Sequence, residues 1–145
     1  MKQKLLFVED ERWGVSPYFF ELEKNGFECI LAQNGDEAVR SLRTNQISLI
    51  SMDIMFPPGK VLGEVPPINA GLKLLEMIRR GKIRNCNPNI DVIILTAVPN
   101  FEIETQIRKL NVSAYLKKPI DFSTVIETFS AIKKESLKNE EQPIK

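Results

Sequence analysis

Five short apolar runs, each followed by a segment with helical spacing, constrain the fold of this chain more than any other feature. The runs cover residues 4–8, 28–32, 47–52, 92–95 and 114–116. Each is short enough for a strand buried on both faces, which is typical of parallel sheets. Alternation of such strands with helices predicts an α/β fold: a mainly parallel sheet covered by helices on both faces, in three layers.

The segments between the runs carry apolar residues three and four positions apart, which indicates amphipathic helices. We expect these residues to be core: Val15, Phe19 and Leu22; Ala38 and Leu42; Leu74, Leu75 and Ile78; Ile103, Ile107 and Leu110; and Phe122, Val125, Ile126, Phe129 and Ile132. Gly14 and Pro17 predict a late start of the first helix, with Ser16 as its N-cap and Pro17 in its first turn.

The length of 145 residues fits a single domain. We expect this domain to cover residues 1–137, followed by a polar tail over 138–145. The segment 56–69, FPPGKVLGEVPPIN, is incompatible with a regular element and long for a connection inside a compact domain. Such a loop is usually functional or mobile.

Composition excludes several classes of function. The net charge of +1 gives no global field that would favour nucleic acid or anionic lipid, and no apolar stretch is long enough to cross a bilayer, so we expect a cytoplasmic protein. Cys29 and Cys86 match no zinc or disulfide pattern, which favours buried thiols. The chain has no histidine, which excludes histidine triads, histidine metal ligands and self-phosphorylation on imidazole.

Polar residues stand at the ends of four of the five runs. Glu9 and Asp10 follow the first, Asp53 the third, Thr96 the fourth and Lys118 the fifth. In an open parallel sheet these carboxyl ends lie at one edge, where ligands bind. We therefore expect three carboxylates, a hydroxyl and an ammonium group to converge there.

Close carboxylates repel one another unless a cation or a proton relieves them. Mg²⁺ prefers oxygen ligands, which suits Asp10 and Asp53, with Glu9 binding directly or through water. The Asp53 carboxylate is then a candidate nucleophile toward phosphorus, giving an aspartyl phosphate. The Thr96 hydroxyl and the Lys118 ammonium group would each contact a phosphoryl oxygen.

The stretches LLFVEDE, LAQNGDEAV, SLISMDIMFP, GLKLLEMIR, VIILTA and SAYLKKPID together resemble the receiver domains of two-component response regulators, in particular single-domain receivers of the chemotaxis type. The resemblance covers residues 4 to about 134. It matches Asp53 to the phosphoacceptor, Thr96 to the switch hydroxyl and Lys118 to the family's lysine. It also matches Glu9 and Asp10 to the acidic pair, Met55 to the residue whose backbone carbonyl completes the metal shell, and Tyr115 to the aromatic switch.

The resemblance implies a flavodoxin-like fold, with five parallel strands in the order 2-1-3-4-5 and five helices. It implies Mg²⁺-dependent transfer of a phosphoryl group to Asp53 from a partner, either a sensor histidine kinase or a histidine phosphotransfer protein. Such a domain is not an enzyme on other substrates, because it catalyses only its own phosphorylation and dephosphorylation. The signal would leave through contacts with an unknown output protein, or through a homodimer formed by the fourth helix, fifth strand and fifth helix, without direct contact to nucleic acid or membrane.

Three features depart from the family pattern. Glu9 stands where aspartate is commoner, Val98 where a polar residue is frequent, and the connection from Asp53 to Gly71 is longer than usual by roughly ten residues. That loop could cover Asp53 or dock a partner through Val61, Leu62, Val65 and Ile68, or it could be a tolerated flexible insertion.

Two other functional classes are open to this sequence. One is a receiver-like protein-interaction domain that phosphorylation does not regulate. The other is an enzyme on a similar sheet, but an aspartyl phosphatase would need an acid where Met55 stands, and the phosphate of a flavin would be repelled by Glu9 and Asp10.

Overall fold

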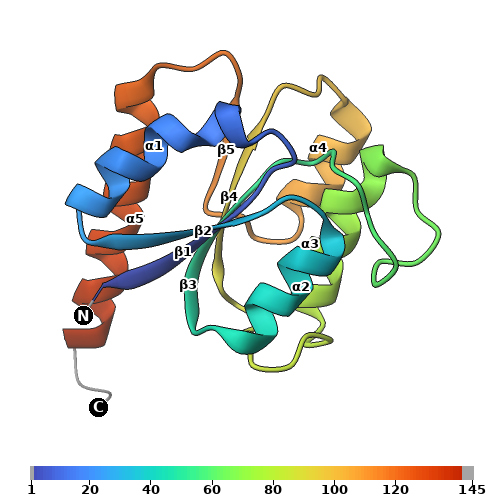
Figure 1. Ribbon diagram of the computed structural model, residues 1–145, viewed down its shortest axis with the longest axis horizontal. Coiled ribbons are helices and arrows are strands. Elements are labelled where there is room, and N and C mark those ends of the chain that lie inside the picture. The colour runs from blue at the N-terminus through green and yellow to red at the C-terminus, as the bar shows by residue number, and fades with distance from the viewer. Residues whose placement is uncertain (1, 142–145) are drawn as a thin grey trace.

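The computed structural model describes residues 2–141 and contains one parallel sheet of five strands (Figure 1). The strands are β1 (Gln3–Val8), β2 (Phe27–Ala32), β3 (Ile47–Met52), β4 (Asp91–Thr96) and β5 (Ala114–Lys117). Their order in the sheet is β2-β1-β3-β4-β5, and every neighbouring pair is parallel. The predicted flavodoxin-like topology is confirmed.

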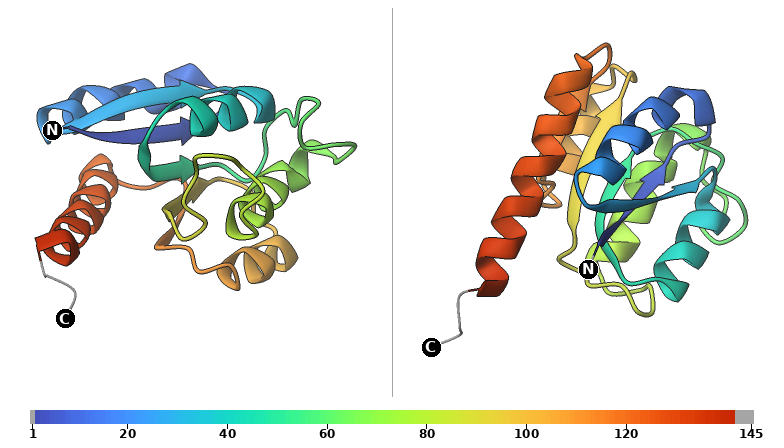
Figure 2. Two further views of the ribbon diagram at one scale, coloured as in Figure 1. Left: turned by 90° about the horizontal axis from the view of Figure 1, so that it is seen from below. Right: turned by 60° about the vertical axis from the view of Figure 1, so that its left-hand side comes forward.

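Within residues 2–141, five α-helices cover the sheet in two layers (Figures 1 and 2). They are α1 (Arg12–Lys24), α2 (Gly35–Thr44), α3 (Ala70–Arg79), α4 (Phe101–Arg108) and α5 (Phe122–Glu141). Helices α1 and α5 lie on one face, and α2, α3 and α4 lie on the other. None of the helices in residues 2–141 combines the length and the apolar character that a membrane span requires.

Each face of the sheet has its own hydrophobic core. Strand β1 shows why: Leu5 and Phe7 are buried against α1 and α5, whereas Leu6 and Val8 are buried against the other helix layer. Alternate residues of a strand point to opposite faces, so a central strand covered on both sides is apolar throughout. Burial of both faces explains the continuous apolar runs in the sequence.

The first helix begins earlier than the sequence predicted. Glu11 is its N-cap residue, and the Gly14 backbone N–H donates to the Glu11 carbonyl at 3.0 Å. Ser16 is therefore not the N-cap, and Pro17 lies inside the helix. A proline ring displaces the hydrogen bond to the carbonyl four positions earlier, here that of Trp13, whose residue is 85% exposed. Water can satisfy that carbonyl, so the helix tolerates the proline.

The last helix also differs from its predicted form. It continues to Glu141, so it enters the segment 138–145 for which we predicted a polar tail; residues 142–145 lie outside the described part of the chain. Phe122, predicted as core, is 45% exposed and stacks on Tyr18 with ring centroids 5.5 Å apart. Cys29 and Cys86 are free and only partly buried, so the prediction of buried thiols holds in part.

The loop 56–69 is more ordered than the sequence suggested. A short 3-10 helix covers Pro67–Asn69, although we predicted no regular element there. Leu62 is 2% exposed, and Val61, Val65 and Ile68 pack against the core under α2, α3 and α4. Leu62 therefore belongs to the core, whereas Val61, Val65 and Ile68 are partly buried and keep some surface that a partner could contact.

Arg79, at the end of α3, ties two loops together beneath the sheet. Its guanidinium group donates to four backbone carbonyls: Leu110 at 2.7 Å, Pro88 at 2.8 Å, Ile90 at 2.8 Å and Asn111 at 3.1 Å. Hydrogen bonds from a charged donor are stronger than neutral ones, and the acceptors would lose their partners together if the group were removed.

We predict that Arg79→Ala lowers the free energy of unfolding by about 2–4 kcal/mol, because several carbonyls lose a charged donor. Arg79→Lys should recover only part of this loss, since one ammonium group does not span four acceptors. Urea unfolding followed by circular dichroism measures both. Arg80→Ala, one residue along and exposed, is the control, and an equal loss in that variant would contradict the assignment.

Candidate functional site

The predicted site residues lie at the carboxyl edge of the sheet. Asp53 directly follows β3, and its backbone N–H donates to the Val8 carbonyl at 3.0 Å, which fixes it beside the end of β1. Glu9 directly follows β1, and its backbone N–H donates to the Ala32 carbonyl at 2.9 Å. Thr96 is the last residue of β4. Parallel pairing thus brings together residues that are far apart in the chain.

The Asp53 carboxylate is held by two short hydrogen bonds to one of its oxygens. Its Oδ1 accepts from the Thr96 hydroxyl at 2.7 Å and from the Ile54 backbone N–H at 2.7 Å. The Thr96 oxygen in turn accepts from the Val98 N–H at 3.1 Å. Thr96 is almost fully buried, so its hydroxyl direction is fixed by these two partners.

Lys118 lies between two carboxylates. Its Nζ is 3.7 Å from Oε2 of Glu9 and 3.8 Å from Oδ2 of Asp53. The Lys118 backbone N–H donates to the Thr96 carbonyl at 2.8 Å, and the bond between Lys118 and Pro119 is cis. One cation therefore faces two anions, which leaves the negative charge of the pair only partly compensated.

Glu9 shows the effect of this crowding on protonation. Burial raises the pKa of Glu9 to about 7, a hydrogen bond with the Asp53 side chain adds to the rise, and the charge of Lys118 opposes it. A carboxyl group that is 6% exposed and beside a second carboxylate favours its neutral form. A bound cation would have the same relieving effect as the proton.

Two predicted ligands, Asp10 and Met55, are exposed. Asp10 is exposed, and its backbone carbonyl, rather than its carboxylate, accepts a hydrogen bond from Gln33 at 3.1 Å. Met55 is 46% exposed, and its N–H points toward Asp53 Oδ1 at 3.5 Å. Within residues 2–141, no three Asp, Glu, Cys or His side chains gather closely enough to hold a metal ion.

Tyr115, the candidate switch residue, lies on β5 beside a charged network that sequence reasoning missed. The Arg108 guanidinium carbon is 4.8 Å from the centre of its ring, and Glu104 accepts from Arg108 at 2.8 Å and pairs with Lys117 at 3.0 Å. The Glu104–Arg108 spacing of four residues was visible in the sequence. Its contact with β5 depends on the fold.

The Tyr115 hydroxyl is buried and has no hydrogen-bond partner within the described part of the chain. Burial and the nearby Glu104 carboxylate raise the pKa of Tyr115 above its ordinary value. An unpaired buried hydroxyl costs about 1–3 kcal/mol, so this ring position is not optimal for the tyrosine.

The loop 56–69 makes no polar contact with Asp53 in the described part of the chain. No hydrogen bond or ion pair recorded for residues 2–141 joins Asp53 to any residue of the loop. The loop instead leaves Asp53 through buried Ile54 and Phe56 and runs toward α2 and α3 (Figure 1). The hypothesis that the loop covers Asp53 stays a prediction.

Comparison with known proteins identifies the family. Residues 5–130 match the model of the response regulator receiver domain, and the chain belongs to this family. It is a receiver domain of two-component signalling, a family of signalling phosphoacceptors that partner with histidine kinases.

Three similar proteins illustrate the range of this family. The chain is 30% identical to the polar-differentiation response regulator DivK of Brucella anthropi, over 90% of this chain and 96% of that protein. It is 30% identical to the phosphate regulon transcriptional regulatory protein PhoB of Klebsiella pneumoniae, over 91% of this chain but only 52% of PhoB. The chain thus spans about half the length of its PhoB relatives. The receiver domain of Francisella response regulator 1452 superposes with a TM-score of 0.72 at 26% identity, covering 93% of this chain and 99% of that one.

The raised pKa of Glu9 predicts a pH-dependent stability. Between pH 4.5, the ordinary pKa of a glutamate, and about pH 7, Glu9 holds a proton in the folded protein but not in the unfolded chain. Stability contributed by this group is therefore complete below pH 4.5 and is lost as the pH rises through 7. Glu9→Gln has no proton to lose at this position. Its free energy of unfolding relative to that of the wild type should therefore rise by on the order of 2 kcal/mol when the pH is raised from about 5 to about 8.

Chemical unfolding in metal-free buffer at both pH values measures this gain. Glu11→Gln, an exposed neighbour, is the matched control and should show no such trend. A gain for Glu9→Gln that does not change with pH would contradict the raised pKa.

Proposed function

We propose that Asp53 accepts a phosphoryl group from a phosphohistidine on a partner protein, with the help of Mg²⁺, Thr96 and Lys118. The observation that carries this proposal is the position of the Asp53 carboxylate, 2.7 Å from a buried hydroxyl and 3.8 Å from an ammonium group. The family of the chain supports it. The chain contains no histidine, so the donor imidazole comes from a partner.

The transfer is a direct displacement at phosphorus. A carboxylate oxygen of Asp53 forms the new O–P bond while the P–N bond to the partner's imidazole breaks, and the electron pair stays on the ring nitrogen, which then takes up a proton. Thr96 and Lys118 are assigned to the phosphoryl oxygens, where a hydroxyl and an ammonium group stabilise the negative charge. Moving Thr96 to this role requires it to release Asp53 Oδ1.

The donor groups at this edge fit Mg²⁺. Glu9, Asp10, Asp53 and the Met55 carbonyl offer only oxygen, the ligand type that this ion prefers, and the partly compensated charge of Glu9 and Asp53 favours a cation. When bound, the ion neutralises charge on the phosphoryl group. The exposed Asp10 side chain is the one that we expect to turn inward on binding.

Exposed apolar side chains around the site support transfer between proteins. Trp13 at the start of α1 is 85% exposed, Phe101 at the start of α4 is 81% exposed, and Met55 lies two residues from Asp53. Aromatic and methionine side chains are enriched where proteins meet. We assign this rim to the partner that carries the phosphohistidine.

For the output of the signal we propose the face of α4, β5 and α5. The unpaired Tyr115 hydroxyl, together with Glu104, Arg108 and Lys117, forms an arrangement that a small movement of Thr96 and β5 would alter. An output protein or a second copy of the chain would bind this face.

We predict that incubation with acetyl phosphate and Mg²⁺ adds one phosphoryl mass to the wild type and none to Asp53→Asn, because the amide is not a nucleophile. Intact-mass spectrometry measures this mass increase, and EDTA should suppress it in the wild type by removing Mg²⁺. Asp91→Asn, at the opposite end of the sheet in β4, is the control and should react normally. A normal yield for Asp53→Asn would overturn the assignment of the site. No yield for the wild type would favour a receiver-like interaction domain that phosphorylation does not regulate.

We predict that Lys118→Ala reduces the rate of phosphorylation by about 10²-fold, because one charged partner of the phosphoryl oxygens is lost. The same change should leave Mg²⁺ binding intact or tighter, since Lys118 competes for Glu9 and Asp53. Mg²⁺ binding can be followed by the fluorescence of the single tryptophan, Trp13, which stands three positions after Asp10 in the sequence, with isothermal titration calorimetry as a second measurement. Weaker Mg²⁺ binding in this variant would contradict the separation of roles.

A further inference from the structure

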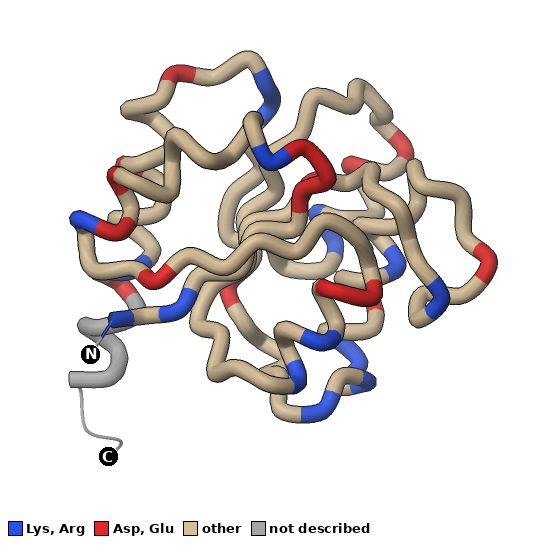
Figure 3. The backbone as a smooth tube through the Cα atoms, viewed as in Figure 1, with Lys and Arg blue, Asp and Glu red and all other residues tan. Residues whose placement is uncertain are grey.

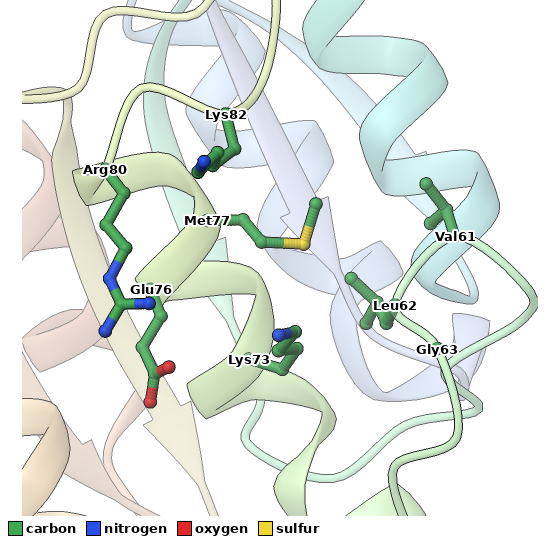
Figure 4. Close-up of a pocket in the computed structure, with 8 residues that line it drawn as sticks. All are labelled: Val61, Leu62, Gly63, Lys73, Glu76, Met77, Arg80 and Lys82. Atoms are coloured by element: carbon green, nitrogen blue, oxygen red, sulfur yellow. The ribbon is translucent and has the colours of Figure 1, made fainter.

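A groove separates the loop 56–69 from α3 on the face of the molecule away from α1 and α5. Its volume is about 380 Å³, within the range of sites that bind ligands. Figure 4 shows the eight residues that line it: Val61, Leu62, Gly63, Lys73, Glu76, Met77, Arg80 and Lys82. We call it the loop–α3 groove.

The wall that the loop contributes is fixed to α2. The Asp36 carboxylate accepts from the backbone N–H groups of Lys60 at 3.0 Å and of Val61 at 2.8 Å, and the Gly35 N–H donates to the Pro57 carbonyl at 2.9 Å. These hydrogen bonds hold the pKa of Asp36 below its usual value. The buried Leu62 anchors the same segment. A wall that is already in place lowers the entropy cost of binding.

The floor of the groove is apolar and adaptable. Figure 4 shows the Met77 side chain extending from α3 toward Leu62, with Val61 on the far wall. Val61 and Met77 are partly buried against the core. Methionine has an unbranched, polarizable side chain that adapts to different apolar groups, and it is common on surfaces that bind peptides.

The rim of the groove is positively charged. The lining residues include three cations, Lys73, Arg80 and Lys82, and one carboxylate, Glu76. None of the three cations makes an ion pair within residues 2–141. The segment 73–84 carries five Lys and Arg residues and one acidic residue, whereas the whole chain has a net charge of +1. Figure 3 shows several basic residues around the C-terminal end of α3 and the connection that follows it, away from the acidic turn after β1.

We propose that the loop–α3 groove is a docking site for a segment of a partner protein that carries apolar side chains flanked by Asp or Glu. The apolar floor of the groove fits the apolar side chains, and the cations of its rim fit the Asp or Glu residues. Nucleic acid fits less well, because Glu76 lies among the cations and none of the eight lining residues offers an aromatic ring for a base. None of the eight lining residues belongs to the site around Asp53, so binding in the groove does not require phosphorylation.

The test is a selection of random twelve-residue peptides displayed on phage, with the unphosphorylated wild-type protein as target. The doubly substituted variant Lys73→Glu/Arg80→Glu serves for counter-selection. Sequences that combine leucine, methionine or phenylalanine with Asp or Glu should be enriched. Absence of enrichment, or enrichment of basic peptides, would overturn the proposal.

The most enriched peptide is then synthesised and its affinity measured by fluorescence polarisation. Affinity should fall about tenfold or more in Lys73→Glu/Arg80→Glu, because two rim attractions become repulsions. It should also fall in Met77→Ala, which leaves the charge unchanged. Lys24→Glu, an exposed reversal on α1, is the matched control and should bind as the wild type does. Circular dichroism confirms that each variant is folded.

Amide chemical shifts of the wild-type protein locate the bound peptide. The largest changes should fall on residues 61–63 and 73–82. Changes centred on α1 or on the α4, β5 and α5 face would overturn the groove assignment, as would tighter binding of a DNA duplex than of the peptide at the same residues. Each of these results leaves the proposed phosphorylation of Asp53 unaffected, so the two proposals fail separately.

Discussion

The site depends on the contact of Lys118 with two carboxylates that the sheet forces together. Parallel pairing of β1 with β3 places Glu9 and Asp53 at neighbouring strand ends, where burial and proximity favour a proton on one of them. Lys118 directly follows β5, and its Nζ lies 3.7 Å from the Glu9 carboxylate and 3.8 Å from that of Asp53. This single charge compensates only part of the charge of the two carboxylates. The edge therefore favours additional positive charge.

Much of the fold and part of this site followed from local sequence patterns. The run 47–52 coincides with β3, and the other four predicted strands lie within the observed ones. Strands buried on both faces leave a strong signal, because most of their residues are apolar. The ends of four of the five runs then identified Glu9, Asp53, Thr96 and Lys118, whose side chains the structure brings together.

What the sequence did not predict depends on contacts between distant residues. The loop 56–69 is held by Asp36, which is 24 and 25 positions away from its partners, and no local pattern announces that bond. The partnership of Glu104 with Lys117 likewise requires α4 to pack beside β5. The start of α1 at Arg12 is a local case: the helix contains Pro17 in its interior, whereas the usual preference of proline for the first turn had predicted a later start. The first two cases are tertiary effects that local preferences do not contain.

The central claim is that Asp53 is the group that receives the phosphoryl moiety at a cation-dependent site. A crystal structure of the protein grown with Mg²⁺ and beryllofluoride, a mimic of the phosphoryl group, tests it most directly. The account predicts beryllium bonded to an Asp53 carboxylate oxygen, fluorine atoms in contact with Thr96 and Lys118, and the metal ion held by Asp10 and its neighbours. A structure in which beryllofluoride leaves Asp53 free, with the metal ion bound elsewhere, would contradict it.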